Sequence, residues 1–502
     1  MSALKAVLQW PVEPEDEFGL ALWTAEEIAV ATGGIPSGEF AASGCEIDSR
    51  EVHEGDLFFA LKGENSDGHR FVAGALSRGA TAAIVERPVD GPHVLVPDTS
   101  RALEDLGKAA RSRVDAAIIG VTGSAGKTGV KEALFAALDR GSRGRAHRSL
   151  KSYNNHVGVP LSLARMPART KFGVFEMGMN HAGELAALTR LVRPHVAIVT
   201  TIAPAHIGHF SGEEAIADAK AEIFEGLEQL GGGEPGAKGG VAIIPADSPH
   251  HALLRAKACQ HAAKVVSFGF AADADVRVLD AVPAPGGGTL VTADMGDRRL
   301  CYTIAMPGDH WVANSLAVMA AVRAVGGDLG AAGLALAEME GLAGRGARGT
   351  IAAQGGDGSG EALLIDESYN ANPASMRVTI RQLGETRARQ RLAVLGAMKE
   401  LGDFEAKLHA DLAGPLLSAK VDRVVLVGPE MAALADALGK TPAGELAAGF
   451  AMAHVDNAVD AVDLLAGPKA SQWYGAGDAI LVKGSNSVGL GALVQALSAR
   501  EK

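Results

Sequence analysis

The sequence of 502 residues has only three cysteines, Cys45, Cys259 and Cys301. They lie far apart and in no spacing typical of a metal site, which argues against a disulfide scaffold and fits a reducing compartment. Long apolar runs are missing as well: no stretch reaches the roughly 18 residues needed to cross a membrane, so we expect no membrane insertion. The N-terminal segment has no apolar run long enough for a secretory signal peptide. We therefore expect a cytoplasmic protein.

An excess of basic residues is also missing, since the formal net charge is −12. Nucleic-acid binders usually carry a basic face, so we expect no nucleic-acid partner. A local basic pocket for a phosphorylated small molecule is still compatible with this charge. The 63 glycines are not periodic, which excludes a collagen-like chain and predicts many turns instead.

The length and the residue pattern predict several α/β domains. At about 150 residues a domain, the chain is long enough for about three. Strand-like runs alternate with helix-like runs, and this alternation predicts parallel, doubly wound sheets. We see no internal repeat. The expected domains are 1–112, 113–344 and 345–502, with a linker at 341–346 and surface loops at 231–236 and 283–288. The expected strands are 56–61, 80–85, 116–121, 172–176, 195–201, 363–365, 392–395, 424–427 and 480–482, with helices at 71–76 and 213–227.

A glycine-rich segment between a buried strand and a helix predicts a phosphate site. It reads Gly123-Ser124-Ala125-Gly126-Lys127-Thr128. Glycines let backbone N–H groups close around phosphate oxygens, and the helix N-terminus adds positive potential. Lys127 is expected to neutralise the β- and γ-phosphates of ATP, and the Thr128 hydroxyl to bind Mg²⁺. The standard spacing would place a glycine at Val121, so the alternative is a glycine-rich turn with an exposed lysine.

Two side chains that follow neighbouring strands are candidate metal ligands. Glu176 ends one predicted strand, and His206 follows the next. Residues just beyond the carboxyl ends of parallel strands meet in one crevice, so both are expected near the phosphate loop. A carboxylate and a neutral imidazole can hold a metal ion that bridges phosphate oxygens. Taken alone, each is more often a solvated surface residue.

Lys220 lies on the apolar stripe of the predicted helix over 213–227. Ile216, Phe224 and Leu227 share its face. From spacing alone, the more frequent arrangement is a lysine whose aliphatic stem packs against the apolar side chains while its ammonium group reaches water. The functional alternative is a desolvated lysine with a lowered pKa, whose neutral amine reacts with CO₂ to give a carbamate that binds a metal.

Taken together, these segments resemble the Mur ligases, which assemble the cytoplasmic peptidoglycan precursor. Within the family, the chain is most similar to the branch that adds D-alanyl-D-alanine to UDP-N-acetylmuramoyl-tripeptide. The phosphate loop has the family's own form, which accounts for its spacing. The chain departs from the family at Trp311, where Asn is usual, and at Ala397, where Asp is frequent. The segments that carry the resemblance are 48–50, 55–63, 67–71, 122–128, 154–161, 176–185, 219–224, 308–314, 366–375, 396–402 and 481–485.

The resemblance implies a set of site residues. It makes Glu176 and His206 magnesium ligands and Lys220 a carbamylated lysine, against the interpretation favoured by spacing. Arg345, Asn314 and Asp366 would contact ATP with the phosphate loop. Residues on the side of the UDP-substrate would be Ser49, Arg50, Lys62, Asp67, His69, Asn154 and Asn155. Residues on the side of the amine substrate would be Tyr369, Asn370, Asn372 and Ser375.

The resemblance also implies a reaction and an architecture. ATP would phosphorylate the tripeptide carboxylate, and the amine of D-alanyl-D-alanine would attack the acyl phosphate, with two Mg²⁺ ions bound. Lys127, Lys220, His206 and Arg345 would carry the catalysis. We expect a monomer with three α/β domains. The N-terminal domain would be smaller, the central one would be a P-loop-type, mostly parallel sheet flanked by helices, and the C-terminal one would be Rossmann-like.

Several alternatives remain at this point. The nearest is the branch of the family that adds the third amino acid to a UDP-muramoyl-dipeptide. The run Tyr369-Asn370-Ala371-Asn372-Pro373 and the absence of an Asp-Asn-Pro-Arg segment disfavour it. A folyl-polyglutamate ligase would leave the first domain unexplained. A P-loop NTPase or kinase of another class would turn over nucleotide without the UDP-substrate. A non-catalytic scaffold is disfavoured because the chain has Lys127, Glu176, His206 and Lys220.

Overall fold

The computed structural model describes residues 21–63, 66–204, 207–232, 238–285, 287–353, 360–442 and 444–499. The chain divides into two compact units. Unit 1 comprises the residues up to Ala116 together with His147–Gly173, and unit 2 comprises Ala117–Ala146 and the residues from Val174 onward. No helix among the described residues is long and apolar enough to cross a membrane.

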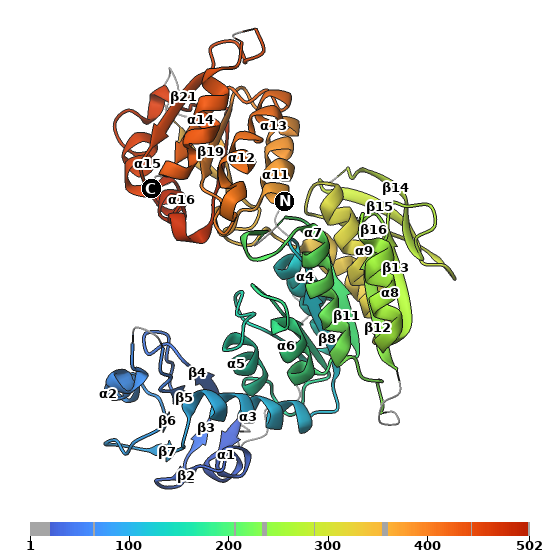
Figure 1. Ribbon diagram of the computed structural model, residues 1–502, viewed down its shortest axis with the longest axis vertical. Coiled ribbons are helices and arrows are strands. Elements are labelled where there is room, and N and C mark those ends of the chain that lie inside the picture. The colour runs from blue at the N-terminus through green and yellow to red at the C-terminus, as the bar shows by residue number, and fades with distance from the viewer. Residues whose placement is uncertain are drawn as a thin grey trace, which may run out of the picture. The chain divides into compact units, whose positions relative to one another are not determined.

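Unit 1 is built on a sheet with the strand order β2-β7-β6-β5-β4, drawn in blue in Figure 1. The pairs from β4 to β7 are parallel, and β2 joins the edge in the antiparallel direction. Leu103 and Leu106 of one helix and Leu161 of another pack against Leu57 and Ile84 of the sheet. Its elements are β1 (Trp23–Thr24), α1 (Ala25–Thr32), β2 (Ile35–Pro36), β3 (Ala41–Ala42), β4 (Gly44–Glu46), β5 (Asp56–Phe59), a 3₁₀ turn (Gly68–Phe71), α2 (Val72–Ser77), β6 (Ala82–Val85), β7 (His93–Leu95), α3 (Thr99–Ser112) and α5 (Gly158–Ala164).

The first part of unit 2 contains a mixed sheet with the order β16-β15-β14-β13-β12-β11-β8-β10-β9. The neighbours from β8 through β11 to β14 are parallel, whereas β14, β15 and β16 form antiparallel hairpins. Its elements are β8 (Ala117–Thr122), α4 (Lys127–Ser142), β9 (Ala146–Arg148), β10 (Phe172–Glu176), α6 (Glu184–Val192), β11 (Val196–Val199), a 3₁₀ turn (Ile207–His209), α7 (Glu213–Ala221), a second 3₁₀ turn (Glu222–Gly226), β12 (Gly239–Pro245), α8 (His251–His261), β13 (Ala262–Gly269), β14 (Val276–Pro283), β15 (Thr289–Asp294), β16 (Arg299–Ile304), α9 (Asp309–Ala324) and α10 (Leu329–Glu338).

The last part of unit 2 contains a sheet with the order β17-β18-β22-β19-β20-β21. All neighbours are parallel except β17, which pairs with β18 in the antiparallel direction. Its elements are β17 (Ala347–Ala353), β18 (Gly360–Glu367), α11 (Pro373–Glu385), β19 (Arg391–Gly396), a 3₁₀ turn (Gly402–Phe404), α12 (Glu405–Ala410), α13 (Ala413–Ser418), β20 (Arg423–Val427), a 3₁₀ turn (Pro429–Met431), α14 (Ala432–Gly439), β21 (Ala451–Val455), α15 (Ala458–Ala466), a 3₁₀ turn (Ala470–Gln472), β22 (Ala479–Lys483), a 3₁₀ turn (Asn486–Val488) and α16 (Gly491–Ser498).

This second sheet is covered on both faces. Leu395 of β19 packs in one buried cluster with Ile380 of α11, and Val394 packs in another with Leu497 of α16. Adjacent residues of a strand point to opposite faces, so a strand that is apolar throughout needs helices on both sides. Figure 1 shows α11 and α13 on one side of the orange and red sheet and α15 and α16 on the other. This is the doubly wound arrangement that the alternating pattern predicts.

The predicted helix over 213–227 is wrong in its second half. The α-helix α7 ends at Ala221 and the chain continues as a 3₁₀ turn. The Glu222 carboxylate accepts hydrogen bonds from two backbone N–H groups at the start of α6, and the carbonyl of Ile223 accepts one from the Thr189 hydroxyl. These long-range contacts outweigh the helical periodicity of the segment. Of the predicted loop over 283–288, Pro283 is the last residue of β14, Gly286 lies outside the described residues, and β15 begins directly after Gly288.

Candidate active site

The phosphate loop follows β8 and leads into α4, as predicted. Gly123 and Gly126 have positive φ angles of 149° and 84°. A Cβ atom on Gly123 would lie 1.9 Å from the Thr200 hydroxyl oxygen, so no larger residue fits there. The residue before α4 is Gly126, which makes no side-chain cap. The first N–H groups of α4 are therefore not capped by the preceding side chain, and such groups bind phosphate oxygens well.

The segment after β11 fixes the shape of this loop. The Ser124 N–H donates to the carbonyl of Thr201 at 2.7 Å. The Ser124 hydroxyl donates to the carbonyl of Ala203 at 2.9 Å and accepts from its N–H at 3.0 Å. The Thr200 hydroxyl donates to the carbonyl of Ala125 at 2.5 Å. The loop is thus preorganised by Thr200 and Ala203, two residues that the sequence pattern did not single out.

Lys127 is folded back onto the loop itself. Its ammonium group donates to the carbonyl of Gly123 at 2.6 Å. Burial lowers the pKa of Lys127; the charge of Glu176 opposes this shift, and that of Arg345 adds to it. The Arg345 guanidinium is therefore close enough to affect the charge of the loop lysine.

Thr128 and Glu176 form a buried pair of oxygen donors beside the loop. The Thr128 hydroxyl donates to a Glu176 carboxylate oxygen at 2.7 Å, and the two residues are 5% and 1% exposed. A hydroxyl and a carboxylate are the hard ligands that Mg²⁺ selects, so this pair fits that ion. The described residues hold no cluster of three or more His, Cys, Asp or Glu side chains that could bind a metal. The third predicted ligand, His206, lies outside the described residues.

Lys220 is 2% exposed on α7. Its stem therefore does not carry the ammonium group out to water. Burial lowers the pKa of Lys220 well below its ordinary value, and the charge of Lys127 lowers it further. These two effects favour the neutral amine, which is the form that reacts with CO₂.

The C-terminal part of unit 2 contacts the phosphate loop through Asn372. Its side-chain N–H donates to the carbonyl of Ser124 at 3.2 Å, and its side-chain oxygen accepts from the N–H of Ser375 at 2.9 Å. The Ser375 hydroxyl accepts in return from the Asn372 N–H at 3.1 Å, which completes a capping box at the start of α11. Two residues predicted on the amine side therefore build a helix start that touches the loop.

The linker before β17 holds Arg345 close to this site. One oxygen of the Asp366 carboxylate accepts from the N–H of Gly344 at 2.6 Å, and the other accepts from the N–H and hydroxyl of Ser368. The guanidinium carbon of Arg345 lies 4.3 Å from the centre of the Tyr369 ring. The Asp366 carboxylate is thus hydrogen-bonded to the linker and to Ser368. The Tyr369 ring makes a cation–π contact with the Arg345 guanidinium.

Lys483 is a buried cation of this region to which the sequence analysis gave no role. It ends β22 directly opposite Glu367 of β18. Its ammonium group donates to the carbonyl of Asn370 at 2.8 Å and lies 3.4 Å from the Glu367 carboxylate. Burial lowers the pKa of Lys483; the nearby Glu367 charge opposes the shift and that of Arg345 adds to it. In the sequence, Lys483 directly follows the predicted strand over 480–482 and lies in the segment 481–485 that resembles the family.

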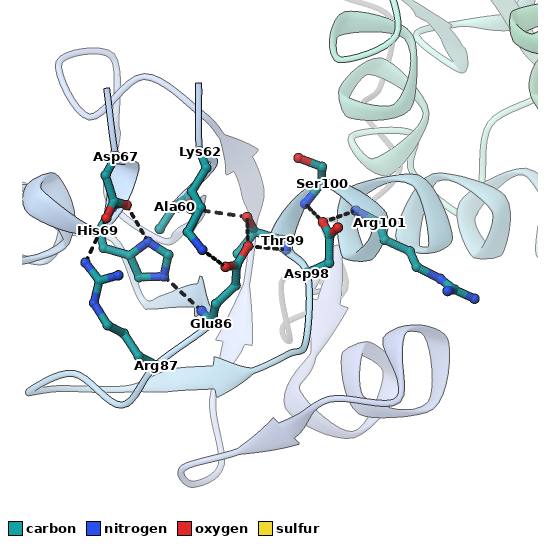
Figure 2. Close-up of polar contacts among 10 residues, drawn as sticks. All are labelled: Ala60, Lys62, Asp67, His69, Glu86, Arg87, Asp98, Thr99, Ser100 and Arg101. Carbon is teal, nitrogen blue, oxygen red and sulfur yellow. Dashed lines mark hydrogen bonds and ion pairs between the residues drawn. The ribbon is translucent and has the colours of Figure 1, made fainter. Parts of the chain in front are cut away.

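In unit 1, Lys62, Asp67 and His69 form one polar network (Figure 2). The Lys62 ammonium group pairs with the Glu86 carboxylate. The His69 ring is buried, with Nδ1 2.7 Å from Asp67 and Nε2 accepting from the Glu86 N–H at 2.9 Å. Since Nε2 accepts, Nδ1 carries the proton and donates to Asp67. Both ring nitrogens are used within the protein, so His69 supports the loop that carries Lys62.

Unit 1 contains a hollow of about 370 Å³, but none of the four remaining predicted residues, Ser49, Arg50, Asn154 and Asn155, lines it. Arg50 pairs with Asp48 at 2.6 Å and is largely exposed, and Ser49 beside it is half-buried. The Asn155 side chain accepts from two backbone N–H groups at the start of α5, and Asn154 is its half-buried neighbour. The hollow is lined by Leu22, Ser43, Gly44, Cys45, Glu46, Glu51, His53, Asp56, Leu150, Lys151, Tyr153 and Arg165.

Comparisons with known proteins decide the family. The Mur ligase middle domain matches residues 121–322, the Mur ligase, glutamate ligase domain matches 356–486, and the Mur ligase family, catalytic domain matches 42–141. The chain is 33% identical over 413 residues to the UDP-N-acetylmuramoyl-tripeptide--D-alanyl-D-alanine ligase of Escherichia coli (strain K12), covering 82% of this chain and 86% of that one. The chain belongs to the Mur ligase family.

Other relatives of this Mur ligase extend the comparison. The enzyme of the same name from Bacillus subtilis (strain 168) is 33% identical, covering 90% of this chain and 93% of that one. A crystal structure of MurF from Acinetobacter baumannii is 30% identical, with a TM-score of 0.77, and covers 95% of this chain and 99% of that one. MurF from Thermotoga maritima in complex with ADP is 25% identical, with a TM-score of 0.69, covering 91% and 97%. The resemblance and the α/β fold class predicted from the sequence are confirmed.

Proposed function

We propose that this Mur ligase joins D-alanyl-D-alanine to UDP-N-acetylmuramoyl-tripeptide at the expense of ATP. The names of its two relatives from Escherichia coli and Bacillus subtilis support this substrate pair. The observation that carries the proposal is the phosphate loop itself, with Lys127, Thr128 and Glu176 on one side and Asn372 of the C-terminal part on the other. The ADP complex of the Thermotoga maritima relative supports ATP as the nucleotide.

The chemistry begins with a carboxylate, which is a poor acyl donor. One carboxylate oxygen of the tripeptide attacks the γ-phosphorus of ATP, ADP leaves, and an acyl phosphate forms. The amine of D-alanyl-D-alanine then attacks the acyl carbon, the amine loses a proton, and inorganic phosphate leaves with the original carboxylate oxygen. The protein contributes mainly position and charge. Lys127 would turn from Gly123 to the phosphates, and Arg345 would face the same charge from the linker.

Magnesium would be held by Thr128 and Glu176, with His206 and Lys220 as the further ligands that the family resemblance implies. When bound, Mg²⁺ supplies positive charge to the phosphate oxygens. For Lys220, we propose that its neutral amine adds to CO₂ and releases a proton, giving a carbamate anion in place of a buried ammonium group. This modification removes the repulsion between Lys220 and Lys127.

We further propose a division of labour along the chain. Residues 1–112 would bind the UDP end of the substrate, 113–344 would bind ATP, and 345–502 would bind the amine and part of ATP. In unit 1, Ser49, Arg50 and Lys62 would contact the UDP-substrate, with His69 and Asp67 holding the Lys62 loop and Asn154 and Asn155 beside the sugar. Tyr369, Asn370, Asn372 and Ser375 would face the amine, with Asn314 and Asp366 on the side of ATP.

Phosphate release from ATP tests this function. We expect release only when UDP-N-acetylmuramoyl-tripeptide and D-alanyl-D-alanine are both present, with one phosphate formed for each UDP-linked pentapeptide. A UDP-muramoyl-dipeptide with a diamino acid serves as the competing pair. Turnover with that pair alone, or turnover of ATP independent of any UDP-substrate, would overturn the proposal.

A further inference from the structure

Trp311 and Gly129 form a contact that the proposed function does not use. A Cβ atom on Gly129 would lie 2.7 Å from Cη2 and 3.1 Å from Cζ2 of the Trp311 indole. The six-membered ring of Trp311 therefore rests on the bare backbone of Gly129, in the first turn of α4. Any larger residue at 129 would push the indole away, so the glycine and the tryptophan form a matched pair.

The same face of α9 also reaches the phosphate loop. Asn314 lies three residues after Trp311, which places both side chains on one side of the helix. A Cβ atom on Gly126 would lie 3.0 Å from the Asn314 side-chain nitrogen. Asn314 thus touches the loop while Trp311 touches the turn that follows it. This face of α9 runs along the path from the phosphate loop to the first turn of α4.

A nucleotide bound to the loop must leave it along that path. The backbone N–H groups of such a loop hold the α- and β-phosphates, and its lysine, at the start of the following helix, reaches the β- and γ-phosphates. The ribose and the base then emerge beside residue 129. Trp311 is half-buried, so part of this residue is accessible. A flat aromatic surface next to an emerging base favours stacking.

We propose that Trp311 is the stacking platform for the base of the nucleotide, and that Gly129 is the residue that allows it to lie there. The proposal rests on ATP binding at the phosphate loop and goes beyond it, because it names the residue that holds the base. Stacking depends little on which base is present, since every base has a π-face. Replacing the indole by a methyl group is expected to weaken ADP binding about tenfold or more.

Binding of ADP, measured by calorimetry, tests the platform. We expect Trp311→Ala to raise Kd about tenfold or more, and Trp311→Phe to stay within about threefold of the wild type. Gly129→Thr should weaken binding as Trp311→Ala does, because it displaces the indole. In the double variant the two effects should not add, since both remove one interaction. Trp473→Phe is the control, because Trp473 lies in the C-terminal part and should keep the wild-type Kd.

Fluorescence gives a second readout, and the wild type tests it without any substitution. ADP should quench the indole emission of the wild type, and the quenching should be absent in Trp311→Phe although that variant still binds ADP. The stacking proposal is contradicted if the wild type binds ADP without quenching, or if folded Trp311→Ala binds ADP as tightly as the wild type. In either case the proposal that the loop binds ATP is unaffected. If the wild type binds no ADP, the proposed function fails first.

Discussion

Asn372 joins the two halves of unit 2, because its side-chain amide caps helix α11 and donates to the carbonyl of Ser124 in the phosphate loop at 3.2 Å. The amide is 6% exposed, so the contact is shielded from water. Tyr369 and Asn370 directly precede this cap, so the phosphate loop and the start of α11 are in direct contact.

The first prediction concerns this amide. Asn372→Ala should lower the free energy of unfolding by about 1 kcal/mol, the usual cost of a lost N-cap. It should also lower kcat/KM about tenfold or more, since the loop loses its contact with α11. Urea unfolding and phosphate release measure the two effects.

Asn457 supplies the matched control for that variant. It caps α15 with two backbone hydrogen bonds and makes no contact with the loop. Asn457→Ala should cost similar stability and leave kcat/KM near the wild type. If both variants lose stability alone, the Asn372–Ser124 contact has no role in the reaction.

The second prediction concerns the oxygen pair at the loop. Thr128→Val removes the hydroxyl that donates to Glu176 and leaves a buried carboxylate with one partner fewer, at a cost of about 1–3 kcal/mol in stability. We expect activity to fall about a hundredfold and the half-saturating Mg²⁺ concentration to rise. Thr128→Ser, which keeps the hydroxyl, should remain close to the wild type in both. If the Thr128→Val enzyme has an unchanged Mg²⁺ dependence, Thr128 is not a ligand of the metal.

The third prediction concerns the carbamate at Lys220. Lys220→Ala should lose most activity, and short carboxylic acids added to the assay should restore part of it by supplying the missing carboxylate. Wild-type protein equilibrated with ¹³C-bicarbonate should give a carbamate carbon signal that is absent in Lys220→Ala. Near-normal turnover of Lys220→Ala without added acid would refute the modification as a functional feature.

The fourth prediction concerns the network in unit 1. His69→Ala leaves Asp67 and the Glu86 N–H without their ring partner, so we expect a loss of about 1–3 kcal/mol in unfolding free energy. It should also raise KM for the UDP-substrate more than it lowers kcat, because the Lys62 loop loses its support. Val30→Ala, at an α1 residue that is 82% exposed and does not line the hollow, is the control and should change neither quantity. Equal effects of the two variants would show that the His69 ring is not a support.

Local patterns were enough to locate the parts of the site that sit at element ends. The phosphate loop follows β8 directly, and Glu176 ends β10, so strand and loop signals alone place them. The partners that shape the loop were not predictable in this way. Thr200 and Ala203 act through a tertiary contact between neighbouring strands, and Lys483 is brought to Glu367 only by the β18–β22 pairing.

Two residues show which contacts the sequence pattern did not predict. His69 was predicted as a ligand contact, but its ring nitrogens are both engaged within unit 1. Trp311 stood out only as a departure from the family, and its indole packs against Gly129, which is 182 positions away in the chain (311 − 129). Pairing of a large residue with a bare backbone leaves no periodic signal, so a single sequence does not reveal it.

The most direct test of the central claim follows an oxygen atom from the tripeptide to phosphate. UDP-N-acetylmuramoyl-tripeptide labelled with ¹⁸O in its terminal carboxylate is incubated with ATP, Mg²⁺ and D-alanyl-D-alanine, and the inorganic phosphate is analysed by mass spectrometry. The account predicts one ¹⁸O atom in each phosphate, because the acyl phosphate breaks between carbon and that oxygen. Unlabelled phosphate alongside a normal UDP-linked product would contradict it.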